Sequence, residues 1–404
     1  MCGIAGFCNF RGDWQKNIER MCDRMYHRGP DASGVWASED HRVVLGHRRL
    51  AIVDLSPAGA QPMISRDERY VIAYNGEIYN HGMIRKKLLA EGKVPAFRGS
   101  SDTETLVEAI AAYGIVDTLK MTKGMFAIAL FDRQEHVLFL ARDRVGEKPL
   151  YYGILKDDLK NGENDGALVF ASDLRSITSL DGFTNSVNVD VLGDYMRYGY
   201  ISAPFSIYRG IWKLEPGKIL KIKLPFDKME FFTYWSMMEA AVAGQKNRFR
   251  GTASEAADEL ERLLREAIAG QMVADVPVGA FLSAGIDSST VVSLMQAQSV
   301  DKVKTFTIGM WEEQFNEAPI AKEIAAHLGT EHTEVYISEE DARSVIPALA
   351  GMFGEPFADS SQIPTYLVSK ITREHVTVSL SGDGGDELFC GYNTYYSIPR
   401  IWNK

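Results

Sequence analysis

Short apolar runs separated by glycine, asparagine and aspartate fill the first 174 residues of the chain. Runs of this length that are rich in β-branched and aromatic residues predict strands. The predicted strands span residues 3–7, 43–45, 70–74, 126–131, 136–141 and 167–171. Two stretches with helical periodicity, 17–26 and 102–113, interrupt them, and Ser101 is placed to cap the second helix. This half of the chain therefore predicts an antiparallel, sheet-rich domain with helices packed on it.

Strand-like and helix-like segments alternate from residue 252 onward. The pattern predicts helices over 253–272, 288–298, 318–328, 339–352 and 361–374, and strands over 278–282, 303–308, 332–337 and 376–380. Such alternation is typical of a doubly wound parallel sheet, which binds ligands at the carboxyl ends of its strands. Prolines break the pattern between 184 and 251, where only 218–223 looks like a strand. We therefore expect a first domain over 2–183, a connector over 184–251 that packs on both domains, and a second domain over 252–404.

Composition narrows the class of protein. The 404 residues are 46% hydrophobic and 24% charged, as in a folded globular protein. The formal net charge of −10 argues against a nucleic-acid-binding surface spread over the whole protein, although it leaves a local basic site open. No run of 18 apolar residues and no signal-peptide pattern occur, so we expect no membrane span and a cytoplasmic location. Four cysteines are too few for a disulfide scaffold, and Cys8, Cys22 and Cys390 are expected to be buried thiols.

Cys2 directly follows Met1, and a residue this small is usually exposed as the new amino terminus when the methionine is trimmed. The free chain end then carries a thiol beside an α-amine whose pKa is about 8, so one residue supplies both nucleophile and base. Position alone leaves a second explanation equally open, in which Cys2 is a small buried residue of a strand.

Polar residues that suit an amino-acid substrate lie elsewhere in the first domain. Asn75 and Gly76 end a strand, so the Asn75 amide and the Gly76 N–H could stabilise an oxyanion. Arg49 could bind a carboxylate with two parallel hydrogen bonds, and Asp102 could bind an ammonium group. Each also has an ordinary explanation, as a turn residue, a surface ion pair or the first acid of a helix. Together they predict a pocket for an α-amino acid beside a nucleophile.

Two small-residue loops follow strands of the second domain. Residues 280–289 leave one predicted strand and enter a helix, which suits backbone N–H groups that bind phosphate, although a plain capped turn would look similar. Residues 381–387 leave another strand, and both loops belong at the same edge of the sheet. Asp287 and Asp386 would there offer the oxygen ligands that Mg²⁺ prefers when it bridges phosphates.

At this point the chain resembles two known families. Cys2-Gly3-Ile4, His27 to Asp31, Arg49 to Asp54, Tyr74 to Asn80 and Ala141 to Tyr152 match the motifs of class II glutamine amidotransferases. Ser283 to Ser288 and Ser381 to Phe389 match ATP pyrophosphatase synthetases, and specifically the asparagine synthetase family. The resemblance covers essentially the whole chain. It implies a four-layer αββα amino-terminal-nucleophile glutaminase domain, followed by an α/β doubly wound synthetase domain.

The resemblance also implies an activity and its residues. Glutamine would be hydrolysed at Cys2, and ammonia channelled to an aspartyl-adenylate made from L-aspartate and ATP with Mg²⁺, giving asparagine, AMP and pyrophosphate. The catalytic residues would be Cys2, Asn75, Gly76 and Asp383. Glutamine would be bound by Arg49, Leu50, Ala51, Ile52, Val53, Asn75, Gly76, Glu77 and Asp102. ATP would be bound by Phe281, Leu282, Ser283, Ala284, Gly285, Asp287, Ser288, Ile308, Ser381 and Gly382. The metal ligands would be Asp287 and Asp386. A homodimer is left open.

Two departures from the family keep alternatives open. Ala284 stands where the family has glycine, and a methyl group would cost about 1 kcal/mol there if the position needs a positive φ. The chain ends at Lys404, 17 residues after Glu387, where we expect the family to continue, so the synthetase domain is expected to be incomplete. The alternatives are an amidotransferase acting on another carboxylate, and a glutaminase or regulatory protein with an impaired synthetase half.

Overall fold

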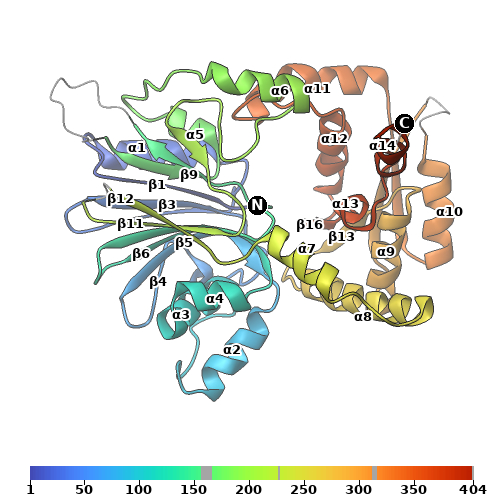
Figure 1. Ribbon diagram of the computed structural model, residues 1–404, viewed down its shortest axis with the longest axis horizontal. Coiled ribbons are helices and arrows are strands. Elements are labelled where there is room, and N and C mark those ends of the chain that lie inside the picture. Colours follow the sequence, from blue (N-terminus) through green and yellow to red (C-terminus); the bar gives the residue numbers. More distant parts are fainter. Residues whose placement is uncertain (156–165, 226–227, 312–315, 403–404) are drawn as a thin grey trace. The chain divides into compact units, whose positions relative to one another are not determined.

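A computed structural model describes residues 1–155, 166–225, 228–311 and 316–402. They form two compact units. Figure 1 colours residues 1–248 of the first unit blue to yellow, and the rest of the chain yellow to red. Unit 1 comprises Met1–Arg248 and Ala350–Ala358, and unit 2 comprises Phe249–Leu349 and Asp359–Lys404. We predicted a connector over 184–251, and its residues 184–248 lie in unit 1, whereas 249–251 lie in unit 2. The domain limits expected from the sequence remain a prediction.

Unit 1 contains two six-stranded antiparallel sheets. The first has the order β10-β8-β9-β1-β3-β2, with β1 (Gly3–Cys8), β2 (Ala32–Ala37), β3 (Val43–Arg49), β8 (Tyr151–Ile154), β9 (Leu168–Ala171) and β10 (Ile211–Lys213). The second has the order β12-β11-β7-β6-β5-β4, with β4 (Met63–Ile64), β5 (Tyr70–Ile78), β6 (Gly124–Asp132), β7 (Val137–Arg142), β11 (Lys218–Lys223) and β12 (Lys228–Thr233).

The two sheets face each other, and side-chain alternation gives each sheet two apolar faces. In β1, Ile4 and Cys8 point into the core between the sheets, whereas Ala5 and Phe7 point outward toward a helix. Since both faces of each sheet are buried, each sheet needs a helical layer on its outer side.

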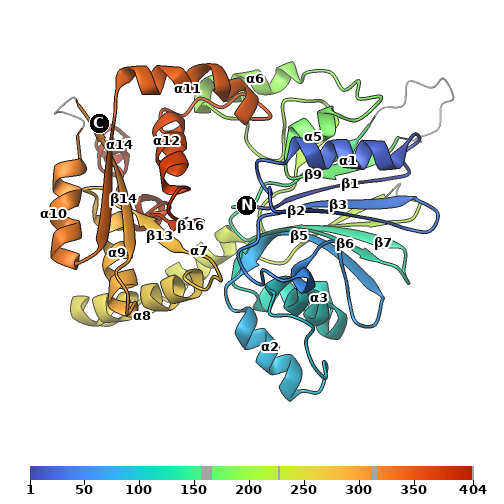
Figure 2. The same ribbon diagram turned by 180° about the vertical axis from the view of Figure 1, so that it is seen from behind.

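Helices supply those outer layers, as Figures 1 and 2 show. α1 (Trp14–Arg24) and α5 (Leu174–Thr178) cover the first sheet, and α2 (His81–Ala90), α3 (Asp102–Tyr113) and α4 (Ile115–Met121) cover the second. The remaining helices of unit 1 are the 3₁₀ turns η1 (Pro57–Gly59) and η2 (Val189–Val191), α6 (Leu192–Tyr198) and α7 (Met237–Lys246). The predicted four-layer αββα architecture is confirmed.

Unit 2 is built on a parallel four-stranded sheet in the order β15-β14-β13-β16. Its strands are β13 (Val278–Phe281), β14 (Lys304–Met310), β15 (Glu331–Ile337) and β16 (Val378–Leu380), and its helices are α8 (Ala253–Gln271), α9 (Ile286–Gln298), α10 (Ala318–Leu328), α11 (Glu339–Met352), α12 (Gln362–Thr372), α13 (Gly385–Phe389) and α14 (Thr394–Trp402). Helices α8, α9 and α10 share one apolar core with β13, and α12 packs against β14. The predicted doubly wound parallel sheet is confirmed.

Several local expectations differ from the structure. Helix α9 begins at Ile286, two residues earlier than predicted, so Asp287 and Ser288 lie in its first turn. The segment with the weak pattern contains more regular structure than the single predicted strand, since β10, β12, α6 and α7 also form there. Cys390 is exposed with φ +59°, so its prediction as a buried thiol is wrong, whereas Cys8 and Cys22 are buried. Among the described residues, no helix is both long and apolar enough to span a membrane.

Candidate functional site

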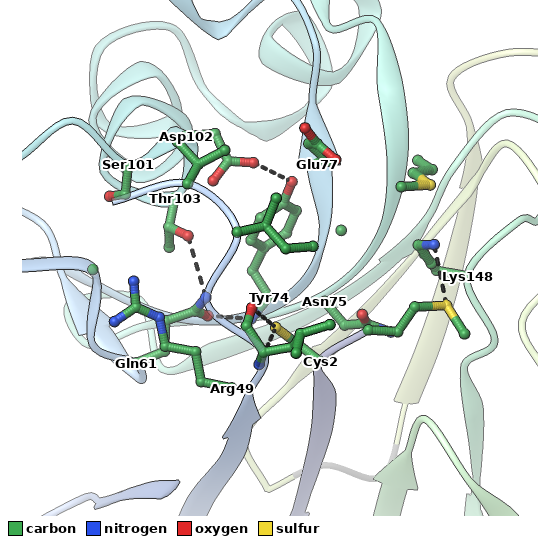
Figure 3. A pocket seen from close by; sticks show the side chains of 17 residues that line it. Cys2, Arg49, Gln61, Tyr74, Asn75, Glu77, Ser101, Asp102, Thr103 and Lys148 are labelled. Carbon is green, nitrogen blue, oxygen red and sulfur yellow. Dashed lines mark hydrogen bonds between the residues drawn. The ribbon is translucent and has the colours of Figure 1, made fainter. Parts of the chain in front are cut away.

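Unit 1 contains a small cavity of ≈ 60 Å³ at the start of β1 and the ends of β3 and β5 (Figure 3). It is lined by eight of the nine residues expected to bind glutamine and by the expected nucleophile, namely Cys2, Arg49, Leu50, Ile52, Val53, Asn75, Gly76, Glu77 and Asp102. Ala51 is the exception, and its N–H donates to a carboxylate oxygen of Asp31, 2.8 Å away. These nine residues come from four separate segments of the chain, which thus meet around one space.

Cys2 lies immediately before β1, which is fully buried along its length. The N–H of Leu50 lies 3.4 Å from its Sγ, and the Cys2 carbonyl accepts a hydrogen bond of 3.0 Å from Arg28 Nε. Burial raises the pKa of the Cys2 thiol, and the Leu50 backbone and the chain-terminal ammonium oppose this shift. A thiol of raised pKa needs a nearby base to become a nucleophile.

Asn75 has a buried side chain whose amide oxygen and nitrogen both lack a hydrogen-bond partner among the described residues. An unpaired buried amide is costly, so it requires an explanation, and a polar group of a substrate that binds in the cavity would supply one. The neighbouring Gly76 needs to be glycine, because a Cβ there would lie 2.2 Å from the carbonyl oxygen of Met125 on β6. The amide and the glycine are therefore held side by side on the cavity wall.

The strand register shows where the Gly76 N–H points. Gly76 is paired with Phe126, whose N–H and carbonyl both bond to Asp143 on the other side of β6. In an antiparallel ladder such a pair exchanges no hydrogen bonds, so the Gly76 N–H points away from β6. The N–H groups of Tyr74 and Ile78 point the same way, to Gln61 and Asp102 of the cavity wall.

Arg49 ends β3 and has a buried guanidinium group. Its Nη1 donates to the carbonyl of Ser56 at 3.2 Å, and its Nη2 donates to the carbonyl of Asp54. A Cβ on Gly59 would lie 2.1 Å from Nη2, so the backbone closes tightly around the cation. The cation is thereby fixed at the cavity.

Two carboxylates lie on the same cavity. Asp102 opens α3, which Ser101 caps as predicted, and one of its oxygens accepts from the Tyr74 hydroxyl at 2.7 Å and from the Ile78 N–H at 3.0 Å. Burial and the charge of Asp102 raise the pKa of Glu77 to about 7, and Lys148 opposes the shift.

Further lining residues were not expected from the sequence: Met1, Gly59, Gln61, Tyr74, Ser101, Thr103, Met125 and Lys148. Gln61 connects β5 to α3 across the cavity wall by two hydrogen bonds. Its Oε1 accepts from the Tyr74 N–H at 2.7 Å, and its Nε2 donates to the Thr103 hydroxyl at 3.2 Å. Tyr74 and Lys148 belong to motifs that we had identified, so their place in those motifs was the available signal. Nothing in the sequence near Gln61 indicated the site.

Unit 2 contains a larger cavity of ≈ 720 Å³ at the carboxyl ends of β13, β14 and β16. Its lining includes Phe281, Leu282, Ser283, Gly285, Asp287, Ser288, Ile308, Ser381, Gly382, Asp383 and Asp386, which are all but one of the residues expected for ATP, metal and ammonia chemistry. The two loops approach closely, since a Cβ on Gly382 would lie 2.7 Å from the nitrogen of Ser288. Glu317, Pro364, Thr365 and Val368 also line it and were not expected.

Ala284 is the residue that is not part of this lining. Its N–H donates to Glu317 at 3.2 Å, and its φ is not positive. Gly285, which follows, has φ −75° and precedes the 13-residue helix α9. Because neither position is left-handed, the backbone penalty that we considered for Ala284 does not arise.

Asp287 and Asp386 suit a Mg²⁺ ion that is bound together with phosphate. A Cβ on Gly385, next to Asp386, would lie 2.3 Å from an Asp287 oxygen, and both aspartates line the cavity. No cluster of three or more metal-ligating side chains occurs among the residues that the structure describes. Mg²⁺ commonly takes one or two carboxylates plus substrate phosphates, and this donor set fits that habit.

Two different protein families match the amino-terminal and the carboxyl-terminal parts of the chain. Residues 1–235 match the family of glutamine amidotransferase domains, and residues 259–404 match the asparagine synthase family. A putative glutamine-hydrolysing asparagine synthetase of Methanocaldococcus jannaschii is 35% identical to the chain, covering 99% of this chain and 77% of the relative. Asparagine synthetase 1 of Bacillus subtilis, also glutamine-hydrolysing, is 37% identical, but the chain spans only 59% of its length.

Among solved structures, glutamine phosphoribosylpyrophosphate amidotransferase of B. subtilis superposes with a TM-score of 0.42 at 18% identity. The match covers 82% of this chain and 65% of that protein. A similarity at this level supports no conclusion beyond those drawn from the sheets and the two sequence families.

Proposed function

The chain belongs to the glutamine-hydrolysing asparagine synthetase family, and we propose that it transfers the amide nitrogen of glutamine to aspartate at the expense of ATP. The observation that carries the glutaminase half is the unpartnered, buried Asn75 amide beside Cys2. The cavity where the two strand-end loops meet supports the synthetase half.

Glutamine is held by charge at its amino-acid end. Arg49 binds the α-carboxylate, and Asp102 and Glu77 face the α-ammonium group. Segment 50–53 closes the cavity around the side chain of the substrate. The cavity is small, which favours a compact substrate and excludes bulk water from the thiol.

Hydrolysis requires that Met1 has been removed beforehand, because only then is the α-amine of Cys2 free. This amine takes the thiol proton as Sγ attacks the side-chain amide carbon of glutamine. The Asn75 amide and the Gly76 N–H donate to the oxyanion of the tetrahedral intermediate. The protonated amine then gives its proton to the leaving nitrogen, ammonia departs, and water hydrolyses the thioester to glutamate and the free thiol.

The second cavity activates aspartate. Phe281, Leu282 and Ile308 form the nucleoside side, and the N-terminus of α9 with the loop before it faces the pyrophosphate group. Asp287 and Asp386 would hold a Mg²⁺ ion, which would offset the charge of the phosphates. The β-carboxylate of aspartate displaces pyrophosphate from the α-phosphorus, and ammonia then displaces AMP. Ser381 and Gly382 meet the AMP end, and Asp383, which accepts from Ser381 at 2.9 Å, assists the attack of ammonia.

The test uses the whole chain with glutamine labelled by ¹⁵N in its side-chain amide, together with ATP, Mg²⁺ and aspartate. We expect mass spectrometry to find amide-labelled asparagine, AMP and pyrophosphate in equal amounts. Parallel reactions with other carboxylic acids identify a different acceptor, and label found only in free ammonia identifies a glutaminase with an impaired synthetase half. Either result would replace the proposal.

Cys2→Ala provides the control for the nitrogen source. It removes the nucleophile of unit 1 and no residue of the second cavity, so glutamine hydrolysis should vanish while synthesis from added ammonium chloride persists. Equal loss with both nitrogen donors contradicts separate sites.

A cytoplasmic location and a homodimer are separate proposals, to be tested by cell fractionation and by light scattering.

A further inference from the structure

Lys148 is a buried cation on the wall of the Cys2 cavity. Its residue is 6% exposed, and it lines the cavity together with Cys2, Glu77 and Asp102. The contact that Figure 3 draws for its ammonium group is a 3.3 Å approach to the sulfur of Met1. A thioether is a weak acceptor, so it compensates a buried charge poorly.

The backbone around Lys148 is fixed on both sides. The Asp143 carboxylate, which is fully buried, accepts from the N–H groups of Val145, Gly146, Glu147 and Lys148. The Lys148 carbonyl accepts from Arg142 Nε at 2.8 Å. A turn held by this many bonds directs one side chain consistently, and here it directs Lys148 to the cavity.

Removal of Met1 changes what Lys148 meets. The proposed hydrolysis requires a free Cys2 amine, and the same cleavage removes the sulfur from the ammonium group. The cation is then left facing a cavity that holds the carboxylates of Glu77 and Asp102. Without a cation, two carboxylates around one substrate ammonium would leave an uncompensated negative charge in a buried space.

We propose that, after Met1 is removed, Lys148 is a positioning residue that pairs electrostatically with Glu77, so that Glu77 and Asp102 together hold the α-ammonium group of glutamine. The inference rests on the proposed hydrolysis of glutamine at Cys2. It assigns Lys148 a task in substrate binding, acting through Glu77, and gives it no contact with the scissile amide.

The charges on every side of this pair set its pH dependence. Glu77 faces Asp102 on α3, Lys148 on the turn, and the buried hydroxyls of Tyr74 and Tyr79. Lys148 faces Glu77, its neighbours Glu147 and Asp143, and the cation of Arg28. Burial lowers the pKa of Lys148 from its ordinary value, and the three acidic groups oppose this.

The direction of the pH effect follows from Glu77. Its pKa is about 7, raised by burial and by Asp102, so its charged form is lost as the pH falls through 7. Lys148 lowers this pKa. Without the cation, the pKa of Glu77 should rise further. As the pH is lowered, glutamine binding should therefore already be lost at a higher pH than in the wild type.

The experiment compares wild type, Lys148→Met and Lys148→Gln in glutamine hydrolysis across pH 6 to 9. We expect the acid limb of kcat/KM to move up by about one pH unit or more in both variants. The change should appear in KM, with kcat at saturating glutamine nearly unchanged. A merely structural role would lower both at every pH. Lys221→Met, which removes a lysine of β11 that pairs with Glu230, is the matched control and should leave the profile unchanged.

A double variant isolates the pathway through Glu77. Glu77→Gln removes the titrating group, so adding Lys148→Met to it should shift no acid limb. An equal shift in the Glu77→Gln background, or no shift in either single lysine variant, overturns the inference. Failure of the proposed function looks different, because wild type would then hydrolyse no glutamine or Cys2→Ala would remain active.

Discussion

In the proposed function, the amide of Asn75 stabilises the oxyanion of glutamine hydrolysis. Its two polar atoms are buried, and no described residue bonds to them, whereas the backbone around it is fixed by pairing with β6. A donor fixed in this way needs no reorganisation when an oxyanion forms, and this is the physical reason for the catalytic effect that we propose for it.

Substituting Asn75 tests this assignment. Asn75→Ala should lower kcat for glutamine hydrolysis by about 10²- to 10³-fold with a small change in KM, because the lost bond forms mainly in the transition state. Steady-state kinetics with glutamine measures this, and synthesis from ammonium chloride is the internal control. A large rise in KM with unchanged kcat would assign Asn75 to ground-state binding instead.

Ala284 is the residue at which the structure changes an expectation. Its φ is not positive, and its N–H already donates to an oxygen atom, that of Glu317, as it would to a phosphate. Ala284→Gly should therefore leave the KM for ATP and the rate of ammonia-dependent synthesis within about twofold of wild type. A marked gain in ATP affinity would show that the methyl group, rather than the backbone angle, hinders phosphate binding.

At the scale of elements, the strong local patterns were predictable and the weak ones were not. Strand β6 and helix α3 stand out by apolar periodicity and by a serine cap. Strand β2 contains alanine, serine and glycine, and it forms because β3 offers a partner along its whole length. Gly34 within β2 also lies so close to Gln61 that a Cβ would be 2.0 Å from its carbonyl oxygen, a tertiary constraint that no local pattern reveals.

The same limit applies to the candidate site. Cys2, Arg49 and Asp102 could be predicted because their motifs carry recognisable chemistry. Gln61 and the tasks of Tyr74 and Lys148 could not, because they depend on which loops meet around the cavity. In unit 2, Glu317 was missed for the same reason, since it is 33 residues from Ala284 in sequence.

The cap of α3 links an element to the site. The Ser101 hydroxyl, in a buried residue, accepts from the Glu104 N–H at 3.2 Å and so fixes the start of the helix where Asp102 lies. Ser101→Ala should lower the free energy of unfolding by about 1 kcal/mol and raise the KM for glutamine. Denaturant titration and glutaminase kinetics measure the two effects. Thr252→Ala removes the cap of α8 in unit 2 and should destabilise the chain without raising that KM.

At the scale of the whole molecule, the chain forms the first part of unit 2, returns to unit 1 for a short segment and then enters unit 2 again. Residues 350–358 belong to unit 1, although the segments before and after them belong to unit 2. Glu355 anchors this return segment, since it pairs with Lys213, accepts from the Ile207 N–H at 3.2 Å and accepts from the Tyr151 hydroxyl at 3.4 Å. Arg175 and Gly199 add bonds to Gly351 and Ala358.

The Glu355–Lys213 pair is nearly buried, because its side chains are only 12% and 15% exposed. Removing one partner of such a pair leaves an uncompensated charge, so Glu355→Gln should lower the free energy of unfolding by about 3 kcal/mol. Glu230→Gln breaks an exposed pair with Lys221 and should cost less than about 1 kcal/mol. Chemical denaturation followed by tryptophan fluorescence measures both.

Combining Glu355→Met with Lys213→Met should recover most of the loss, because apolar groups of similar size avoid the stranded charge. If the single variant is as stable as wild type, the return segment is held by its backbone bonds and not by this ion pair.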